Sequence, residues 1–337
     1  MKHFVRMIAA ACCALAAAGA VACAKDADAN WRAVEVAAIP HVLRGDAGAD
    51  EALVAGRLTY RGGVELTSPD PDFGGFSALS VSPDGRGLLA VSDRAQWLAA
   101  GLVYDDKGRL AGLAGARMAA LTGADGAVIS GANADAEGLA LADGDALVSF
   151  EREPRVDAYR IGADGLLNYA DRRLDLTDVK ELRNNDSLES VAQLADGRLV
   201  TIAEGGKDGD APSRTGWILN GEVLSTFTYR PAKDFNLSDA HAGSDGGVYF
   251  LERAYSRLKG VRINVKMTHA DEIAPGADLA AAKLAEFGPL YAIDNFEGLA
   301  ARKDILGRTF LYLISDDNFS DRQKTLLLMF ELTDAAE

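Results

Sequence analysis

Acidic residues recur at two fixed places in a phrase that the chain repeats five times. Each copy opens with a strand pattern and returns to end near an acid, and the first four copies turn at an Asp-Gly pair. The opening positions hold Ser77, Glu137, Glu189, Ser238 and Glu297, and the closing positions hold Asp93, Glu151, Glu204, Glu252 and Asp316. Acids that come close together cannot all stay ionised without bound cations or arginines. The repeats therefore predict two rings of carboxylates that need positive partners.

The sequence offers both kinds of positive partner. Arg94, Arg152 and Arg253 directly follow three of the closing acids. The run Asp316-Asp317-Asn318 supplies oxygen ligands of the kind that Ca²⁺ or Mg²⁺ takes. A structural alternative is that the acids bind backbone N–H groups or pair with neighbouring arginines.

Two further residues are candidates for chemistry. His241 lies close to Asp239 in the fourth copy, where it is either a base or an ordinary hydrogen-bonded residue. Lys259 follows that copy and either faces phosphate or belongs to a solvated strand. The repeated Asp-Gly pairs are typical of tight turns and have no chemical role in this interpretation.

The elements that carry these residues are predicted to be hairpins. Period-two alternation on both sides of each Asp-Gly pair is typical of strands. The opening positions are spaced by 60, 52, 49 and 59 residues, or 55 on average, which suits a four-stranded propeller blade. We therefore expect an all-β, six-bladed β-propeller in which an N-terminal strand, beginning at residues 31–39, and a C-terminal strand at residues 325–332 close one blade. A helix is expected only at residues 276–287.

The N-terminus resembles an export signal. Lys2 and Arg6 precede an apolar run of small residues, so residues 1–24 are predicted to be a signal peptide or a lipoprotein signal, with Cys23 as the lipid acceptor in the second case. Residues 25–50 are expected to form a tether and a first strand, and residues 51–337 the propeller domain. The expected location is the periplasm or the exterior, with membrane contact only through a lipid on Cys23.

Composition excludes several classes of protein. The net charge of −15 argues against nucleic acid as a partner. Cysteines occur only within the predicted signal, and three histidines follow it, which argues against a thiolate or multi-histidine metal site. The chain has no Gly-x-Ser-x-Gly elbow, His-Glu-x-x-His motif or Walker loop. A serine hydrolase would need a different site.

Six segments of the chain form a specific set of motifs, at residues 73–77, 91–94, 135–139, 149–151, 294–298 and 315–318. Together they resemble the phytase-like domain family of exported bacterial proteins, and the resemblance covers about residue 50 to the C-terminus. The resemblance implies a propeller related to alkaline phytases, which use calcium ions to hydrolyse phosphate esters on an acidic face. It implies metal or water-activating roles for Asp93, Glu137, Glu151, Glu189, Glu204, Glu252, Glu297, Asp316 and Asp317, and phosphate binding by Arg94, Arg152 and Arg253.

We assign catalysis to Glu204 and Glu252 of that set and to His241, and we add Lys259 to the substrate-binding residues. The expected partner is a small-molecule ester, and the expected oligomeric state is a monomer. Asp239 and Asn318 join the metal ligands. The favoured function is a metal-dependent phosphoric-ester hydrolase using Ca²⁺, with Mg²⁺ as the other cation. A Ca²⁺-dependent carboxylic-ester or lactone hydrolase, with ligands from Glu137, Asn185, Glu189, Asp239 and Asp316, is an alternative. A periplasmic propeller that only binds a ligand is another.

Overall fold

The computed structural model describes residues 31–44, 53–162, 167–177, 188–204 and 212–333. These residues are almost entirely in strands and turns. Within them, helix is limited to two short 3₁₀ segments, η1 (Gly131–Ala134) and η2 (Ala270–Glu272). No helix in this part of the chain is both long enough and apolar enough to cross a bilayer. The prediction of an all-β chain is confirmed.

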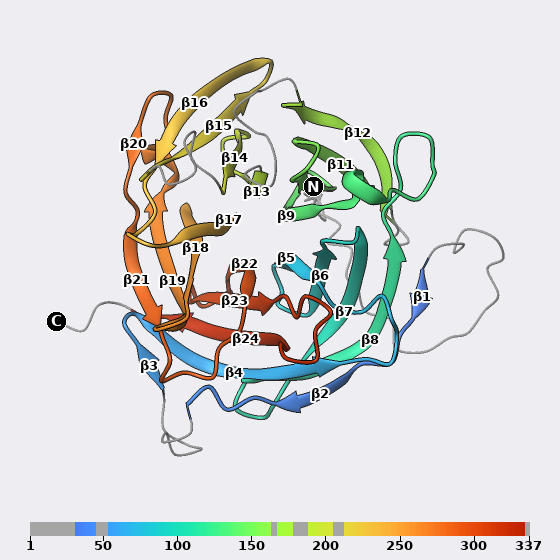
Figure 1. Ribbon diagram of the computed structural model, residues 1–337, viewed down its shortest axis with the longest axis vertical. Coiled ribbons are helices and arrows are strands. Elements are labelled where there is room, and N and C mark those ends of the chain that lie inside the picture. The colour runs from blue at the N-terminus through green and yellow to red at the C-terminus, as the bar shows by residue number, and fades with distance from the viewer. Residues whose placement is uncertain (1–30, 45–52, 163–166, 178–187, 205–211, 334–337) are drawn as a thin grey trace, which may run out of the picture.

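The strands form five antiparallel units, here called blades, arranged around a common centre (Figure 1). Blade 1 comprises β5 (Phe76–Val81), β6 (Gly87–Ser92), β7 (Gln96–Tyr104) and β8 (Leu110–Ala120); blade 2 comprises β9 (Ala136–Ala142), β10 (Asp145–Phe150), β11 (Arg155–Ile161) and β12 (Leu167–Asp175); blade 3 comprises β13 (Leu188–Gln193), β14 (Leu199–Ala203), β15 (Arg214–Asn220) and β16 (Val223–Tyr229). Blade 4 comprises β17 (Asn236–Ala242), β18 (Gly247–Ser256), β19 (Gly260–His269) and β21 (Ala282–Phe287); blade 5 comprises β22 (Phe296–Lys303), β23 (Thr309–Ser315), β24 (Thr325–Leu332) and β4 (Leu58–Thr67).

The first strands of the five blades lie innermost and contact one another in a closed ring, in the order β5, β9, β13, β17 and β22. Blade 5 is closed by pairing of β24 with β4, which comes from the other end of the described chain. β4 in turn meets β8 through one parallel pair, Gly62 with Leu110, and so joins blades 5 and 1. Closure by N- and C-terminal strands is therefore confirmed.

The expected number of blades is not confirmed, because the described residues form five rather than six. The predicted first strand at residues 31–39 does not start a blade. It divides into β1 (Arg32–Ala33), which pairs with β8, and β2 (Ala37–Pro40), which pairs with β4. The short β3 (Val54–Ala55) also pairs with β4. The residues that the repeat spacing assigned to a sixth blade thus form outer edge strands of blades 1 and 5 instead.

The expected helix at residues 276–287 is also wrong. This segment contains β20 (Asp278–Leu279), which adds to β16, and β21, which is the outer strand of blade 4. The alanine-rich composition favours a helix, but pairing along β19 satisfies the backbone of β21, and Leu284 and Phe287 pack into the core. Tertiary pairing overrides the local preference.

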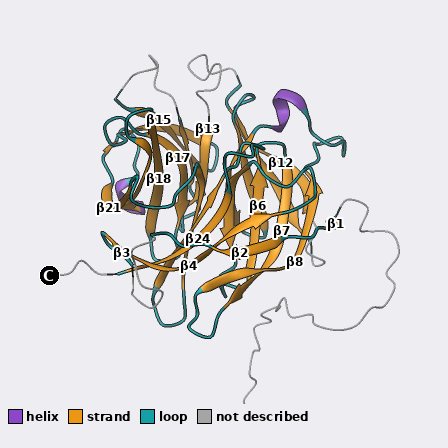
Figure 2. Cartoon of the chain, turned by 60° about the horizontal axis from the view of Figure 1, so that its bottom comes forward, coloured by secondary structure: helices purple, strands orange, loops and turns teal. Residues whose placement is uncertain are grey.

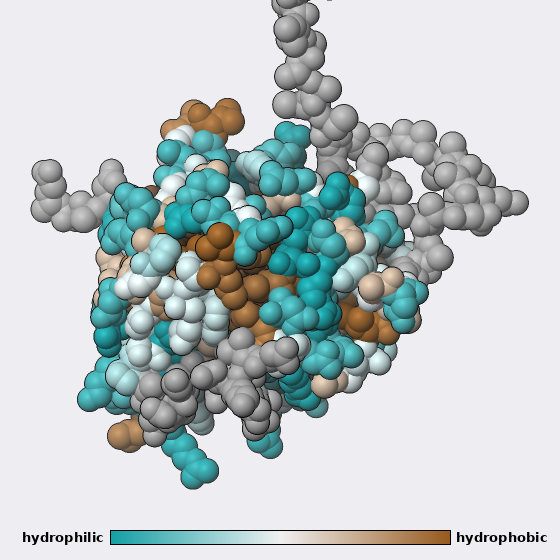
Figure 3. All heavy atoms as spheres, turned by 90° about the horizontal axis from the view of Figure 1, so that it is seen from above, coloured by the Kyte–Doolittle hydropathy of each residue, from teal (hydrophilic) through white to brown (hydrophobic). Residues whose placement is uncertain are grey.

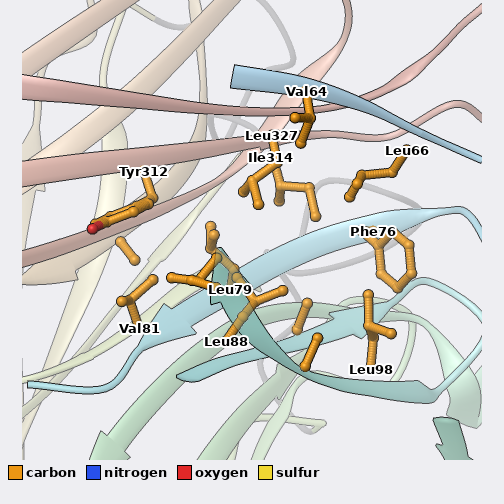
Figure 4. Packing of buried hydrophobic residues seen from close by; sticks show 14 of the residues in the cluster. Val64, Leu66, Phe76, Leu79, Val81, Leu88, Leu98, Tyr312, Ile314 and Leu327 are labelled. Atoms are coloured by element: carbon orange, nitrogen blue, oxygen red, sulfur yellow. The ribbon is translucent and has the colours of Figure 1, made fainter. Parts of the chain in front are cut away.

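The core lies between the blades. Figure 4 shows the junction of blades 5 and 1, where Val64, Ile314 and Leu327 face Phe76 and Leu79. Every residue of β5 and of β23 is buried, because both faces of these strands are covered by neighbouring blades. This explains why their sequences read as nearly continuous apolar runs.

The two ends of the blades have different compositions. The Asp-Gly pairs join the first and second strands at one end; in the second repeat both Asp143 and Gly144 have positive φ, of 51° and 84°. The inner strands begin, and the second strands end, at the other end of the blades, which we call the acidic face. Loops gather at both ends of the strands in Figure 2. The Asp-Gly pairs are therefore turns remote from the acids.

Candidate functional site

Each inner strand begins with a β-bulge at the opening position of the repeat. The ladder skips one residue between Phe76 and Ala78, and does so at the same place in the other four blades. The unpaired residues are Ser77, Glu137, Glu189, Ser238 and Glu297. A bulge bends the strand and re-aims the extra side chain. Glu137, Glu189 and Glu297 act electrostatically on one another from three different blades, as the predicted first ring requires.

The closing positions are defined by a recurrent backbone hydrogen bond. The backbone N–H groups of Asp93, Glu151 and Asp316 donate to the carbonyl oxygens of Gly75, Asp135 and Asn295, at 2.9 Å each. Each accepting residue lies two positions before the bulge residue of its inner strand. In blade 4 the residue at this position is Arg253, which pairs with Asn236. The second ring therefore contains an arginine in blade 4.

Glu252, predicted as a catalytic member of that ring, lies one position earlier and points elsewhere. Its side chain is fully buried and accepts hydrogen bonds from Tyr229 Oη (2.7 Å), Lys266 Nζ (3.0 Å) and the Ala232 N–H (3.2 Å). Because Tyr229 belongs to blade 3 and Lys266 to blade 4, Glu252 links these two blades through its hydrogen bonds. The register shift of one residue separates it from the ring.

Two groups of three carboxylates meet at blades 2 and 3. Ligand oxygens of Asp135, Glu137 and Glu151 lie within 4.8 Å of one another, and the same holds for Glu151, Glu189 and Glu204. Glu151 belongs to both triads. Each triad could hold a metal ion, since carboxylate oxygens are the ligands of hard divalent cations.

Asp135 is the ligand that sequence reasoning missed. It immediately precedes β9, outside the two aligned positions. A signal was present, because blade 5 has Asn295 at the equivalent place. Asn295 Nδ2 donates to Glu297 Oε1 at 2.8 Å and to Asp316 Oδ2 at 3.4 Å.

Blades 4, 5 and 1 complete the cluster with a mixture of charges. Arg253 Nη2 lies 3.6 Å from Glu297 Oε1, and its charge partly offsets the burial that raises the pKa of Asp316 to about 6. Asp93 is influenced by Asp316 from blade 5 and by Asp135 from blade 2. We use the term acidic cluster for Asp93, Asp135, Glu137, Glu151, Glu189, Glu204, Glu297 and Asp316.

Burial and mutual repulsion hold several of these acids toward the neutral form. Burial, with the charge of Asp316, raises the pKa of Asp93 to about 7; burial, with that of Asp135, raises the pKa of Glu151 to about 7. Burial and Asp316 raise the pKa of Glu297 to about 8. The pKa values of Glu137 and Glu189 are also raised well above the ordinary value, first by burial and then by Glu297 and Glu204 respectively. A cation among these groups would reverse the effect.

The predicted basic residues lie at the rim of the cluster. Arg152 Nε forms an ion pair with Asp135 Oδ2 at 2.6 Å, and its side chain is half exposed. The guanidinium of Arg94 stacks 3.2 Å above the ring of Phe319, and its charge offsets only part of the rise in the pKa of Asp93 that burial and Asp316 cause. Lys259 is exposed in the turn between β18 and β19.

Asp239 and His241 face blade 5 rather than the cluster. Asp239 Oδ2 accepts a hydrogen bond from the Leu299 N–H at 2.7 Å, and Asp239 Oδ1 accepts one from the N–H of the next residue, Ala240, at 2.8 Å. His241 bonds to the Ala301 backbone, and burial lowers its pKa to about 4. Both side chains thus connect the inner strands of blades 4 and 5.

Asp317 and Asn318 shape a loop. Asp317 accepts hydrogen bonds from the N–H groups of Gly75 and Phe319 and from Thr325 Oγ1, each at 3.0 Å. Asn318 is exposed, has a φ of 50°, and donates its N–H to Asp316 Oδ1. These contacts engage both carboxylate oxygens of Asp317 within the loop. Asn185, Cys23 and residues 1–24 lie outside the described residues.

A hollow of about 290 Å³ lies away from the acidic cluster, near the Asp-Gly turns of blades 2 and 3. It is lined by Leu147, Leu199 and Leu219 and by Arg173. Figure 3 looks onto this side of the molecule and shows hydrophobic surface between hydrophilic regions. Arg173 is already paired with Asp145 at 2.5 Å, so the hollow offers less unpaired charge than the acidic face.

The family assignment follows from the same residues. The model of a phytase-like family, described as having esterase-like activity of phytase, matches residues 71–319. The chain belongs to this family. The matched range includes every member of the acidic cluster, and no curated protein matches the chain.

Solved propellers are similar only at a low level. A putative gluconolactonase has 12% identity and a TM-score of 0.40, covering 89% of this chain and 94% of its own. A PQQ-bound aldose sugar dehydrogenase from Streptomyces coelicolor has 12% identity and a TM-score of 0.40, with coverages of 83% and 97%. The C-terminal WD40 domain of Sif2 has 11% identity and a TM-score of 0.35, with coverages of 80% and 77%.

The donor set of the cluster fits a hard cation. Asp93 Oδ1 is buried without a hydrogen-bond partner among the described residues, and Ser77 Oγ, at the bulge of the same blade, is likewise unpartnered. Buried polar atoms without a partner are costly. All donors here are oxygen atoms, as Ca²⁺ and Mg²⁺ require.

Proposed function

We propose that this protein is an exported hydrolase of phosphate esters that depends on Ca²⁺, with Mg²⁺ as the competing choice. The observation that carries the proposal is the pair of carboxylate triads joined by Glu151. Membership of a family described by an esterase-like activity of phytase supports the ester as the reacting bond. The predicted signal supports a periplasmic or secreted location, and the substrate is a small molecule acted on by a monomer.

The residues divide into three roles. Asp135, Glu137 and Glu151 would hold a cation in one triad, and Glu189 with Glu151 in the other. A cation held there would supply Lewis acidity and make a nearby water more acidic. Glu204, at the edge of the second triad, accepts a hydrogen bond from Asn236 Nδ2 at 3.3 Å and is the candidate general base for the attacking water. Arg253 is placed to bind an anionic oxygen of the ester.

The test is hydrolysis of p-nitrophenyl phosphate and phytate with Ca²⁺, with Mg²⁺ and with chelator. We expect turnover that needs added Ca²⁺ and falls by more than about tenfold in Glu151→Gln, since even outer-shell partners of a metal are worth that much. Glu222→Gln is the matched control, because Glu222 is exposed in the turn between β15 and β16. Absence of turnover, or equal turnover in Glu151→Gln, contradicts the proposal.

The contacts of Asp239 support a phosphoester over a carboxylic ester or lactone. Asp239 is one of the ligands of the lactonase-like alternative, and both of its oxygens bind backbone N–H groups. Activity on lactones alone would nevertheless establish that alternative. Strong thermal stabilisation by Ca²⁺ without turnover of any ester would establish a propeller that only binds a ligand.

A further inference from the structure

The hairpin of β18 and β19 ends in exposed apolar side chains. Its pairing continues past the closing position at Arg253 to Ser256, which meets Gly260, and this adds about 10 Å at roughly 3.3 Å per residue. Tyr255 near this end is 68% exposed, and Leu258 in the turn is 93% exposed. The hairpin therefore carries large apolar groups away from the core of blade 4.

A neighbouring loop adds a third apolar side chain. A Cβ on Gly260 would lie 3.9 Å from Pro289 Cγ, so the loop that follows β21 runs beside the end of the hairpin. Leu290 in this loop is 78% exposed. Single exposed leucines are ordinary on protein surfaces, but large apolar groups gathered on one projection indicate a contact surface. We call Tyr255, Leu258 and Leu290 the apolar tip.

Basic side chains accompany these apolar groups. Arg257 and Lys259 flank Leu258 in the turn; both are exposed, and neither forms an ion pair within the described chain. Residues 254–261 contain no acid, although the net charge of the whole chain is −15. The apolar tip is thus a locally basic point on an acidic protein.

This combination fits the surface of a lipid bilayer. Leucine enters the boundary between headgroups and acyl chains, tyrosine is favoured at the level of the headgroups, and lysine and arginine attract anionic lipids. A protein partner fits less well. Stable protein interfaces bury about 800 Å² on each side, and a convex hairpin end with three apolar side chains offers less than that.

The N-terminal end of the described chain lies at the same end of the molecule. Arg32 pairs with Met118, close to where β8 ends beside the start of β7, and β7 follows the closing acid Asp93 of blade 1. Cys23 lies nine residues before Arg32, from 32 minus 23, and nine residues span at most about 30 Å. A lipid on Cys23 would therefore hold the acidic face toward the membrane, and the apolar tip with it.

We propose that the apolar tip inserts into the headgroup region of a bilayer that contains anionic lipids, with Arg257 and Lys259 among the headgroups. The contact is peripheral, because one hairpin end enters the membrane and the blades stay outside it. It orients the acidic face toward the membrane surface. This inference goes beyond the proposed function and does not depend on it.

The test measures sedimentation with vesicles of the exported chain carrying Cys23→Ser, which cannot be lipidated at that position. One set of vesicles is phosphatidylcholine alone, and the other is its equimolar mixture with phosphatidylglycerol. We expect Leu258→Ser/Leu290→Ser to weaken binding to the mixed vesicles about tenfold. The matched control is Ile305→Ser/Leu306→Ser, which changes two exposed apolar residues at the Asp-Gly end and should leave binding unchanged.

The charges provide a second arm of the test. Arg257→Ser/Lys259→Ser should weaken binding about tenfold on the mixed vesicles and leave binding to phosphatidylcholine unchanged. A loss in this variant with none in Leu258→Ser/Leu290→Ser would indicate attraction without insertion and would overturn the proposal. Equal binding by the leucine variant and its control, or no vesicle binding at all, would overturn it as well. Vesicle binding needs no turnover, so each result stands whether or not the protein hydrolyses esters.

Discussion

At the scale of single residues, the acidic face concentrates charge that the fold alone does not neutralise. Glu151 is shared by two triads, and Arg253 is the cation at the equivalent position of blade 4. Asp93 has a buried oxygen without a partner in the described chain. Sites of this kind lower the stability of the metal-free protein and are stabilised by the ligand that they bind. This loss of stability is confined to the acidic face, since each acid comes from the end of a well-packed strand.

The raised pKa values predict how the metal-free protein responds to pH. Asp93 and Glu151 titrate near 7 and Glu297 near 8 in the folded state, against ordinary carboxyl values of about 4 in the unfolded chain. The folded state therefore binds more protons than the unfolded state between about pH 4 and pH 8, and the free energy of unfolding falls as pH rises through this range. Urea unfolding in chelator at a series of pH values measures it.

Calcium provides the control for this prediction. Protons must leave before the carboxylates bind a cation, so the apparent Ca²⁺ affinity should rise over the same pH range. Saturating Ca²⁺ should then oppose the loss of stability. A free energy of unfolding that increases from pH 5 to pH 8 in chelator would contradict the raised pKa values.

At the scale of elements, the bulge at the start of each inner strand places the cluster. The residue after the bulge lies against the next blade: a Cβ on Gly138 would come within 2.6 Å of the Val191 N and 2.5 Å of Ser149 Oγ. Asp239, at the same place in blade 4, instead uses its carboxylate to bind the Leu299 N–H. The close approach of inner strands is thus achieved by glycine in one blade and by a hydrogen bond in another.

The substitution Gly138→Ala tests this close approach. We expect a loss of about 1–3 kcal/mol in the free energy of unfolding, because the added methyl group meets backbone atoms of β13, together with weaker Ca²⁺ binding through displacement of Glu137. Urea denaturation and calorimetric Ca²⁺ titration measure the two effects. Gly112→Ala is the control, since its Cβ would meet Ala38 and Val103 at 3.7 and 3.8 Å. Equal stability of the two variants would refute the packing argument.

Particular elements show what the sequence could predict. Alternation and Asp-Gly turns specify the hairpins, and the strand at residues 325–332 agrees in both bounds with β24. The opening position was found because it recurs in sequence. The sequence did not reveal that Arg253, rather than Glu252, occupies the closing position of blade 4, because this depends on which residue pairs with Asn236 across two strands. The number of blades was missed for a related reason: edge strands such as β1 and β2 add length without adding a repeat.

At the scale of the whole molecule, one antiparallel pairing completes the ring. β24 and β4 join segments from the two ends of the described chain, and Leu328 of β24 packs fully buried against Gly63. The first three strands of blade 5 are consecutive, so only its outer strand is supplied from the N-terminal side. Such a closure leaves no long exposed strand edge at this junction.

Leu328→Ala should reduce the free energy of unfolding by about 2–5 kcal/mol, as expected when a large buried side chain is truncated. Thermal and urea unfolding measure the loss. Leu306→Ala, which changes a leucine that is 73% exposed in the turn between β22 and β23, should change the free energy of unfolding by less than about 0.5 kcal/mol. A similar small change for both variants would mean that the closure contributes little to stability.

The acidic cluster takes its carboxylates from four blades, and Asp93 and Asp316 are 223 residues apart in the chain, from 316 minus 93. A molecule in which blade 5 has not docked keeps both candidate triads, which come from blades 2 and 3, but lacks Glu297 and Asp316 at the mouth. Because Glu297 acts electrostatically on Glu137 and Glu189 of these triads, calcium affinity should change when blade 5 docks and so report whether the ring is fully assembled. Competition with a calcium indicator dye could grade refolded preparations by their fraction of complete rings, with no need for a substrate.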